Sequence, residues 1–183
     1  MNATTLINRI SRSFQTLFAD DAELFDLGSE GVNEQTLTFR LRLYLAEEFR
    51  RHNVDCEYNR LWDGTKKCVR LGITWMKPDV IVHLRQSDAA NLFCLEAKKQ
   101  ANWKDLKTFP DDVEKKLRAL THMGEAYHYS LGLAWRIAPS ANLNHHEAIW
   151  FLHGEPRLTT NLGRFEKELF DELIKYPSPA LQQ

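Results

Sequence analysis

Two acidic residues and a lysine in the middle of the chain have the types and the spacing that metal-assisted hydrolysis requires. Asp79 follows Pro78, and Glu96 is separated from Lys98 by Ala97 alone. Mg²⁺ takes oxygen ligands and is typically held by one or two carboxylates together with phosphate oxygens of a substrate. A bound divalent ion polarises a phosphate and activates a coordinated water, and a nearby lysine supplies a compact cation for either group. These residues therefore indicate hydrolysis of phosphodiester bonds with Mg²⁺, for which Mn²⁺ can substitute.

Two short apolar runs predict the strands that carry these residues. Residues 79–84 are rich in β-branched side chains and start directly after Pro78, and residues 92–98 form a second run. The simplest arrangement of the two runs is an antiparallel hairpin. Because Asp79 begins the first strand and Glu96 lies near the end of the second, the hairpin would place the two carboxylates side by side.

The spacing within the second strand decides which side chains share a face. Glu96 and Lys98 are two residues apart and should project from the same face, whereas Ala97 should point into the core. A single Glu or Lys in a strand is usually a solvent-facing charge. Glu96, however, follows four apolar residues, and a charge at the end of a buried strand is costly unless it is paired or metal-bound. We therefore predict that Asp79, Glu96 and Lys98 form one site.

A further carboxylate is predicted at the start of a helix. Asn33 is a candidate N-cap for a helix over residues 34–51, and Glu34 lies close to the centre of its apolar stripe. The helix dipole alone also favours a Glu in the first turn, so a purely capping role for Glu34 stays open. Glu48 is the alternative, on nearly the same face but about 21 Å further along the axis. The stripe consists of Leu37, Leu41, Tyr44, Leu45 and Phe49.

Five polar residues are candidates for contacts with a substrate. A strand predicted over residues 54–60 would send alternate side chains to opposite faces, so only one alternating pair can face the site, and the sequence does not decide which. A helix predicted from residue 111 or 112 to about residue 122 carries two lysines that could contact phosphates, with a solvated face as the alternative. The candidates are Glu57, Asn59 and Arg60 from the strand and Lys115 and Lys116 from the helix.

The remaining segments complete a mixed α/β order. Apolar side chains at helical spacing predict helices over residues 5–18 and 164–176, and two more strands are predicted over residues 129–137 and 148–152. Residues 28–32 and 61–67 are interpreted as a break and a turn. At 183 residues without an internal repeat, we expect one domain over residues 1–183, with a central mixed β-sheet of about five strands flanked by helices.

Composition narrows the class of protein further. Hydrophobic residues at 43% and charged residues at 27% are ordinary values for a folded domain, which argues against extensive disorder. The apolar runs are too short to span a bilayer, and residues 1–20 lack the order of a secretory signal, so we expect a cytoplasmic protein without a membrane partner. The three cysteines have no CxxC spacing, which favours buried reduced thiols over a disulfide framework or a zinc site.

Charge is distributed unevenly along the chain. Residues 40–118 hold 17 Lys or Arg against 12 Asp or Glu, a balance of +5, although the whole chain has a net charge of -1. The middle of the chain could therefore face phosphates, with a solvated mixed surface as the alternative. The histidines offer no second site, because adjacent His145 and His146 would point apart and His83 lies in an apolar strand.

The pair Pro78-Asp79 followed by Glu96-Ala97-Lys98 resembles the signature of the PD-(D/E)xK nuclease superfamily. The superfamily core is a helix, three strands, a helix and a further strand, and the predicted order over residues 34–137 is similar to it. With Glu34 and the stretch 54–60 included, the chain resembles a group of small stand-alone bacterial or phage members whose biological role is generally unassigned.

The resemblance implies a restriction-endonuclease-like core over about residues 34–137, with the first and last helices as additions. It implies that Asp79 and Glu96 bind Mg²⁺, that Lys98 assists catalysis, and that Glu34 completes the metal shell directly or through water. The implied substrate is DNA, cleaved as an endonuclease or exonuclease, with a homodimer as one way to cut two strands. The alternative is a nucleic-acid- or protein-binding module of the same fold that has weak or no turnover and acts with a partner.

Overall fold

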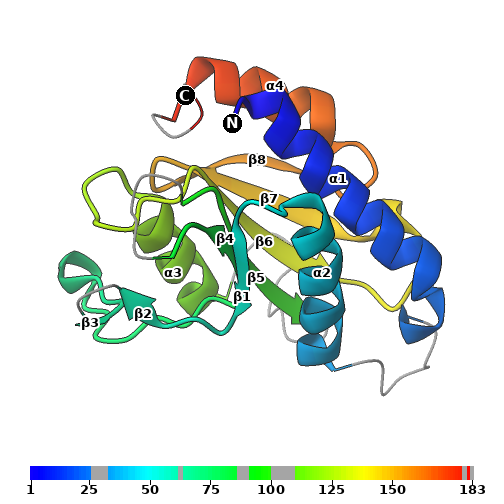
Figure 1. Cartoon of the computed structure of the whole chain (residues 1–183), viewed down its shortest axis with the longest axis horizontal. Coiled ribbons are helices and arrows are strands. Elements are labelled where there is room, and N and C mark those ends of the chain that lie inside the picture. Colours follow the sequence, from blue (N-terminus) through cyan, green and yellow to red (C-terminus); the bar gives the residue numbers. More distant parts are fainter. Residues whose placement is uncertain (26–32, 62–63, 86–90, 100–109, 179–180, 182–183) are drawn as a thin grey trace.

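The computed structural model describes residues 1–25, 33–61, 64–85, 91–99, 110–178 and 181, with the backbone alone for residues 60, 61, 64 and 65. Its centre is a six-stranded mixed sheet in the order β1-β4-β5-β6-β7-β8 (Figure 1). β5 and β6 pair in parallel, and the other neighbours in this sheet pair antiparallel. The strands are β1 (Asn53–Cys56), β4 (Val80–His83), β5 (Phe93–Lys99), β6 (Leu131–Ile137), β7 (Glu147–Leu152) and β8 (Glu155–Asn161).

Helices cover both faces of this sheet. α1, α2 and α4 pack on one face, where α1 contacts both of the others, and α3 packs on the opposite face against β5, β6 and β7. Figure 1 shows α3 across the strands from α2. α3 lies between β5 and β6 in the chain, as the crossover of a parallel pair requires. The helices are α1 (Ala3–Asp20), α2 (Glu34–Glu48), α3 (Asp111–Thr121) and α4 (Phe165–Lys175).

The side chains of β5 alternate between the two faces. Phe93, Leu95 and Ala97 belong to the hydrophobic cluster under α1, α2 and α4, whereas Cys94 belongs to the cluster under α3. Both faces of the strand are therefore buried. Glu96 continues the alternation of Cys94, so its side chain is directed to the α3 face.

The predicted helices are present, and their ends differ from the prediction by at most three residues. The helices predicted over residues 5–18, 34–51, 111 or 112 to 122, and 164–176 correspond to α1, α2, α3 and α4. Asn33 caps α2 as predicted, because its side chain accepts a hydrogen bond from the backbone N of Gln35 at 3.0 Å. The break predicted over residues 28–32 lies outside the described residues.

The sheet differs from the prediction in two places. It has six strands rather than about five, because β8 pairs with β7; β8 is largely exposed and contains Pro156, so no apolar alternation marks it in the sequence. The sequence predicts a strand over residues 54–60, but β1 ends at Cys56, because Glu57 has a φ of 50°, outside the extended region. Within the segment interpreted as a turn, β3 (Gly64–Thr65) pairs with β2 (Arg60–Leu61).

All three cysteines lie in the part of the chain that the structure describes. Cys56, Cys68 and Cys94 are free; Cys68 and Cys94 are buried and Cys56 is partly buried. Among the described residues, no helix combines the length and the apolar character that crossing a membrane would need.

Candidate active site

The pairing of β4 with β5 brings Asp79 to Glu96. Val80 pairs with Leu95 in antiparallel register, and extending this register by one residue puts Asp79 opposite Glu96, as the hairpin prediction requires. Directly opposed residues project from the same face. Oδ2 of Asp79 also accepts a hydrogen bond from the backbone N of Ala97 at 2.8 Å, which fixes the carboxylate at the end of β5.

Glu96 is a fully buried acid with an unsatisfied oxygen. Its side chain is 0% exposed, and Oε2 lies 2.6 Å from Nζ of Lys116 on α3. Oε1 is buried without a hydrogen-bond partner in the described part of the chain. Burial, followed by the nearby charge of Asp79, raises the pKa of Glu96 from 4.5 to about 8. An ionised carboxylate can accept several hydrogen bonds, so a single ammonium leaves Glu96 able to bind another cation.

Asp79 shares this electrostatic environment. Burial raises the pKa of Asp79; the Ala97 N–H and the ammonium groups of Lys116 and Lys98 oppose the shift, and Glu34 adds to it. A buried carboxyl group whose pKa is raised by burial and by the charge of a neighbouring carboxylate, as that of Glu96 is by Asp79, is a recognised sign of a functional site. A divalent cation would relieve their repulsion.

Glu34 and Lys98 form a second ion pair beside the first. Nζ of Lys98 lies 3.4 Å from Oε2 of Glu34, and Oε1 of Glu34 accepts from the backbone N of Lys99 at 2.7 Å. Burial on its own lowers the pKa of Lys98, but Glu34, Asp79 and Glu96 raise it above its ordinary value. Lys98 is therefore a charged lysine among three carboxylates.

The contacts of Glu34 and Glu48 decide between the two helix carboxylates. Glu34 accepts a hydrogen bond from the end of β5, so its contacts extend beyond α2. Glu48 instead forms an ion pair with Arg12 of α1 at 2.6 Å. The structure thus brings Glu34, and not Glu48, to Lys98.

The predicted substrate-binding residues do not all lie in the site. Lys116 lies in the site, on Glu96, whereas Lys115 is exposed. The alternation expected over 54–60 is wrong because β1 ends first: Glu57 is exposed and pairs with Lys77 at 2.8 Å, and the backbone O of Asn59 accepts from the N of Lys66 at 2.8 Å. The side chain of Arg60 lies outside the described residues.

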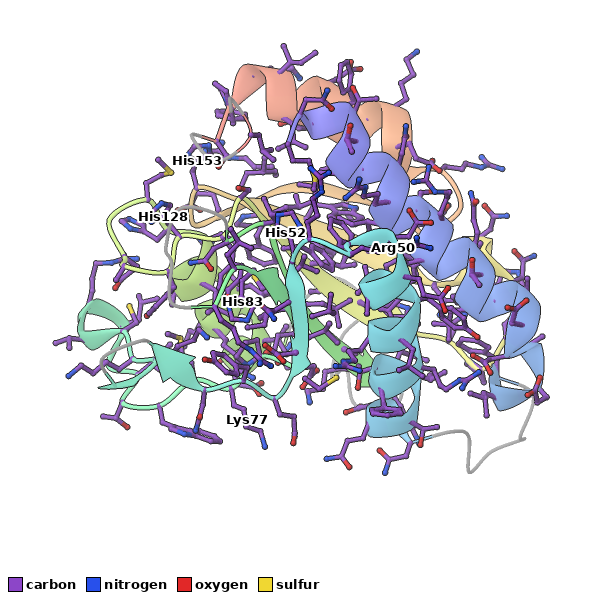
Figure 2. The ribbon with its side chains drawn as sticks, viewed as in Figure 1. Arg50, His52, Lys77, His83, His128 and His153 are labelled. Carbon is purple, nitrogen blue, oxygen red and sulfur yellow. The ribbon has the colours of Figure 1, made fainter. Side chains whose placement is uncertain are left out.

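Two residues near the site were not singled out in the sequence. The backbone O of Lys77 lies 3.5 Å from Nζ of Lys116, and Nζ of Lys77 lies 5.8 Å from the ring centroid of Trp75, which is 53% exposed. Figure 2 shows Lys77 at the lower edge of the molecule, below His83. The sequence feature that could have identified them is their position, two and four residues before Asp79.

Two of the histidines, His83 and His146, are buried and make contacts within the fold. Nε2 of His83 lies 2.9 Å from Oδ2 of Asp55 in the interior (Figure 2). His146 is 0% exposed, and its Nε2 donates to the backbone O of Ser140 at 2.6 Å.

The acidic residues fit an open metal site rather than a closed one. In the described ranges, no three His, Cys, Asp or Glu side chains gather closely enough to hold a metal ion by themselves. Mg²⁺ does not require such a cage, since it usually keeps several waters and takes one or two carboxylates. Asp79 and Glu96 supply two carboxylates, and Oε1 of Glu96, which has no hydrogen-bond partner within the described ranges, supplies an acceptor. These two residues fit the ion, whereas the two carboxylate oxygens of Glu34 contact Lys98 and the backbone N of Lys99.

Comparison of the chain with protein-family models, with curated proteins and with solved structures finds no match.

Proposed function

We propose that this chain is a metal-dependent nuclease with a restriction-endonuclease-like core of the PD-(D/E)xK kind, and that it hydrolyses phosphodiester bonds in DNA. One observation carries the proposal: the fully buried carboxylate of Glu96, with one oxygen that no described residue pairs, lies opposite Asp79 in the register of β4 and β5. The order α2, β1, β4, β5, α3, β6 also agrees with the core of that superfamily.

Each residue has a distinct task in the proposed reaction. A divalent ion held by Asp79 and Glu96 would polarise the scissile phosphate and activate a water. The Ala97 N–H holds Asp79 in place, and burial keeps water from Glu96. Lys98 keeps its charge among the carboxylates, where it can stabilise an anionic phosphate or orient the attacking water. Glu34 positions the ammonium of Lys98.

Substrate contacts are assigned to Lys77, to Trp75 beside it and to Lys115 on α3. Exposed Trp75 offers a face on which a base can stack, and Lys77 and Lys115 supply exposed or partly exposed cations for phosphates. The proposal includes a cytoplasmic location, since free thiols suit a reducing compartment. It also includes a homodimer as the assembly that cuts both strands.

A binding module without turnover is the second candidate. The observation that favours it is that both lysines of the site are engaged in ion pairs, Lys98 with Glu34 and Lys116 with Glu96. Such a module would bind nucleic acid with little dependence on a divalent ion.

A cleavage assay separates the two candidates. Purified protein is incubated with linear, circular and single-stranded DNA and with RNA, in Mg²⁺, Mn²⁺ or EDTA. We expect cutting of DNA that needs the metal and falls at least about 100-fold in Asp79→Asn and in Lys98→Ala. Asp112→Asn, an exposed acid at the start of α3, is the matched control. Cutting that survives in both site variants contradicts the assignment, and binding without cutting favours the module.

A further inference from the structure

Lys116 is held in the site mainly through one carboxylate oxygen. Its Nζ lies 2.6 Å from Oε2 of Glu96, whose side chain is fully buried, while the side chain of Lys116 is 23% exposed. Its other acceptor is the backbone O of Lys77 at 3.5 Å, which is long for a hydrogen bond. The ammonium is thus anchored at one strong contact, and its stem reaches the surface.

The two lysines of the site neutralise different acids. Lys98 lies 3.4 Å from Oε2 of Glu34, a longer contact than that of Lys116 with Glu96. Because Oε1 of Glu96 has no hydrogen-bond partner among the described residues, Lys116 provides the hydrogen-bonded cation that compensates the charge of Glu96 whenever this carboxyl group is ionised. Without Lys116 an ionised Glu96 would be a fully buried charge with no hydrogen-bonded cation, which is strongly destabilising.

We propose that Lys116 is a built-in counter-ion of Glu96 that a divalent cation displaces, and that the released ammonium then contacts a phosphate of the nucleic acid. The inference rests on the proposed function. An ammonium and a divalent cation repel each other at short range and compete for the same carboxylate. The flexible four-carbon stem lets the ammonium move toward solvent, where a bound phosphate would lie. Lys116 therefore acts as a positioning residue that controls access to Glu96.

Mn²⁺ binding to the full chain, without nucleic acid, separates this role from a structural one. Lys116→Gln removes the competing charge, so we expect the Kd for Mn²⁺, from the electron paramagnetic resonance of the free ion, to fall about tenfold, the size of one charge-assisted hydrogen bond. A purely structural lysine predicts an unchanged or larger Kd, and either result overturns the proposal.

Two matched variants control for charge and folding. Lys167→Gln makes the same charge change at an exposed position of α4 and should leave the Kd for Mn²⁺ within about twofold of wild type. Lys116→Arg keeps the charge and should resemble wild type. Circular dichroism of each variant at the binding temperature confirms that the folded protein is being compared.

A second measurement follows the released ammonium to the nucleic acid. The salt dependence of duplex binding is compared between Lys98→Ala, which limits cleavage, and the double variant with Lys116→Gln. With Mn²⁺, the slope of log K against log salt concentration should be smaller in magnitude by about 0.9 in the double variant, which is the contribution of one phosphate contact. In EDTA the two proteins should have the same slope. Equal slope changes in both conditions contradict displacement. If the wild type does not bind Mn²⁺, the proposed function is contradicted. If the wild type binds Mn²⁺ and Lys116→Gln leaves the Kd unchanged, only this inference is contradicted.

Discussion

Replacing Glu96 with glutamine should stabilise the metal-free protein while removing its response to metal. The amide keeps the size of the side chain and an oxygen that can accept from Lys116, but it carries no charge. The wild-type carboxylate is fully buried beside Asp79 and has one oxygen without a partner in the described residues. We therefore expect Glu96→Gln in EDTA to have the larger free energy of unfolding at pH 7.

The size of the effect follows from the pKa of Glu96. Burial raises this pKa from 4.5 to about 8, so the folded chain keeps a proton that the unfolded chain releases. Stability from this group is fully present below pH 4.5 and is lost as the pH rises toward 8, at about 1.4 kcal/mol per pH unit. At pH 7 the loss is about 3 kcal/mol. Because the buried amide also lacks full hydrogen bonding, we expect a net gain of about 2 kcal/mol, or about 5 °C in Tm.

Urea unfolding of both proteins at several pH values checks this prediction. In EDTA the difference in unfolding free energy between Glu96→Gln and wild type should grow from pH 5 to pH 8. Saturating Mg²⁺ should stabilise the wild type and leave the variant unchanged. Glu168→Gln, an exposed change on α4, should shift stability by less than about 0.5 kcal/mol. A variant that is less stable than wild type in EDTA, with the same pH dependence, refutes the reasoning.

Three further predictions concern other parts of the molecule. Trp75→Ala should weaken binding of single-stranded DNA about tenfold in fluorescence anisotropy, while Trp75→Phe, which keeps an aromatic face, should not; equal weakening by both argues against stacking. Gly132→Ala should cost about 1–3 kcal/mol in urea unfolding, because a Cβ there would lie 2.8 Å from Cγ2 of Thr121; an unchanged midpoint contradicts the tight packing of α3 on β6. Burial lowers the pKa of His146 from 6.5 to about 4, so on acidification the unfolded chain binds a proton at a higher pH than the folded chain does. In the Glu96→Gln protein, the free energy of unfolding should therefore fall by about 3 kcal/mol between pH 6.5 and pH 4. A free energy of unfolding that stays constant over this range would contradict the prediction.

The central pair of carboxylates was predictable because local rules determine it. The apolar runs after Pro78 and before Glu96 define two short strands, and antiparallel pairing is the simplest connection between them. A period of two residues then directs Glu96 and Lys98 to one face. Asn33 and Glu34 were predictable for the same reason, since helix capping is local.

The features that the sequence did not predict depend on packing or on a single backbone angle. Lys116 reaches Glu96 only because α3 packs across β5, which no local pattern encodes. The positive φ of Glu57 ends β1 and removes the alternation on which its role was argued. The sequence did not predict β8, because an edge strand that is largely exposed does not need alternating apolar residues.

The central claim is that Asp79 and Glu96 together bind a divalent cation in the interior of the sheet. Anomalous X-ray diffraction from crystals grown with Mn²⁺ tests it most directly. The account predicts an anomalous peak within coordination distance of a carboxylate oxygen of each residue, and its loss in crystals of Glu96→Gln. Crystals in which Mn²⁺ lies elsewhere, or in which the carboxylates of Asp79 and Glu96 stay without a metal at saturating Mn²⁺, would contradict the account.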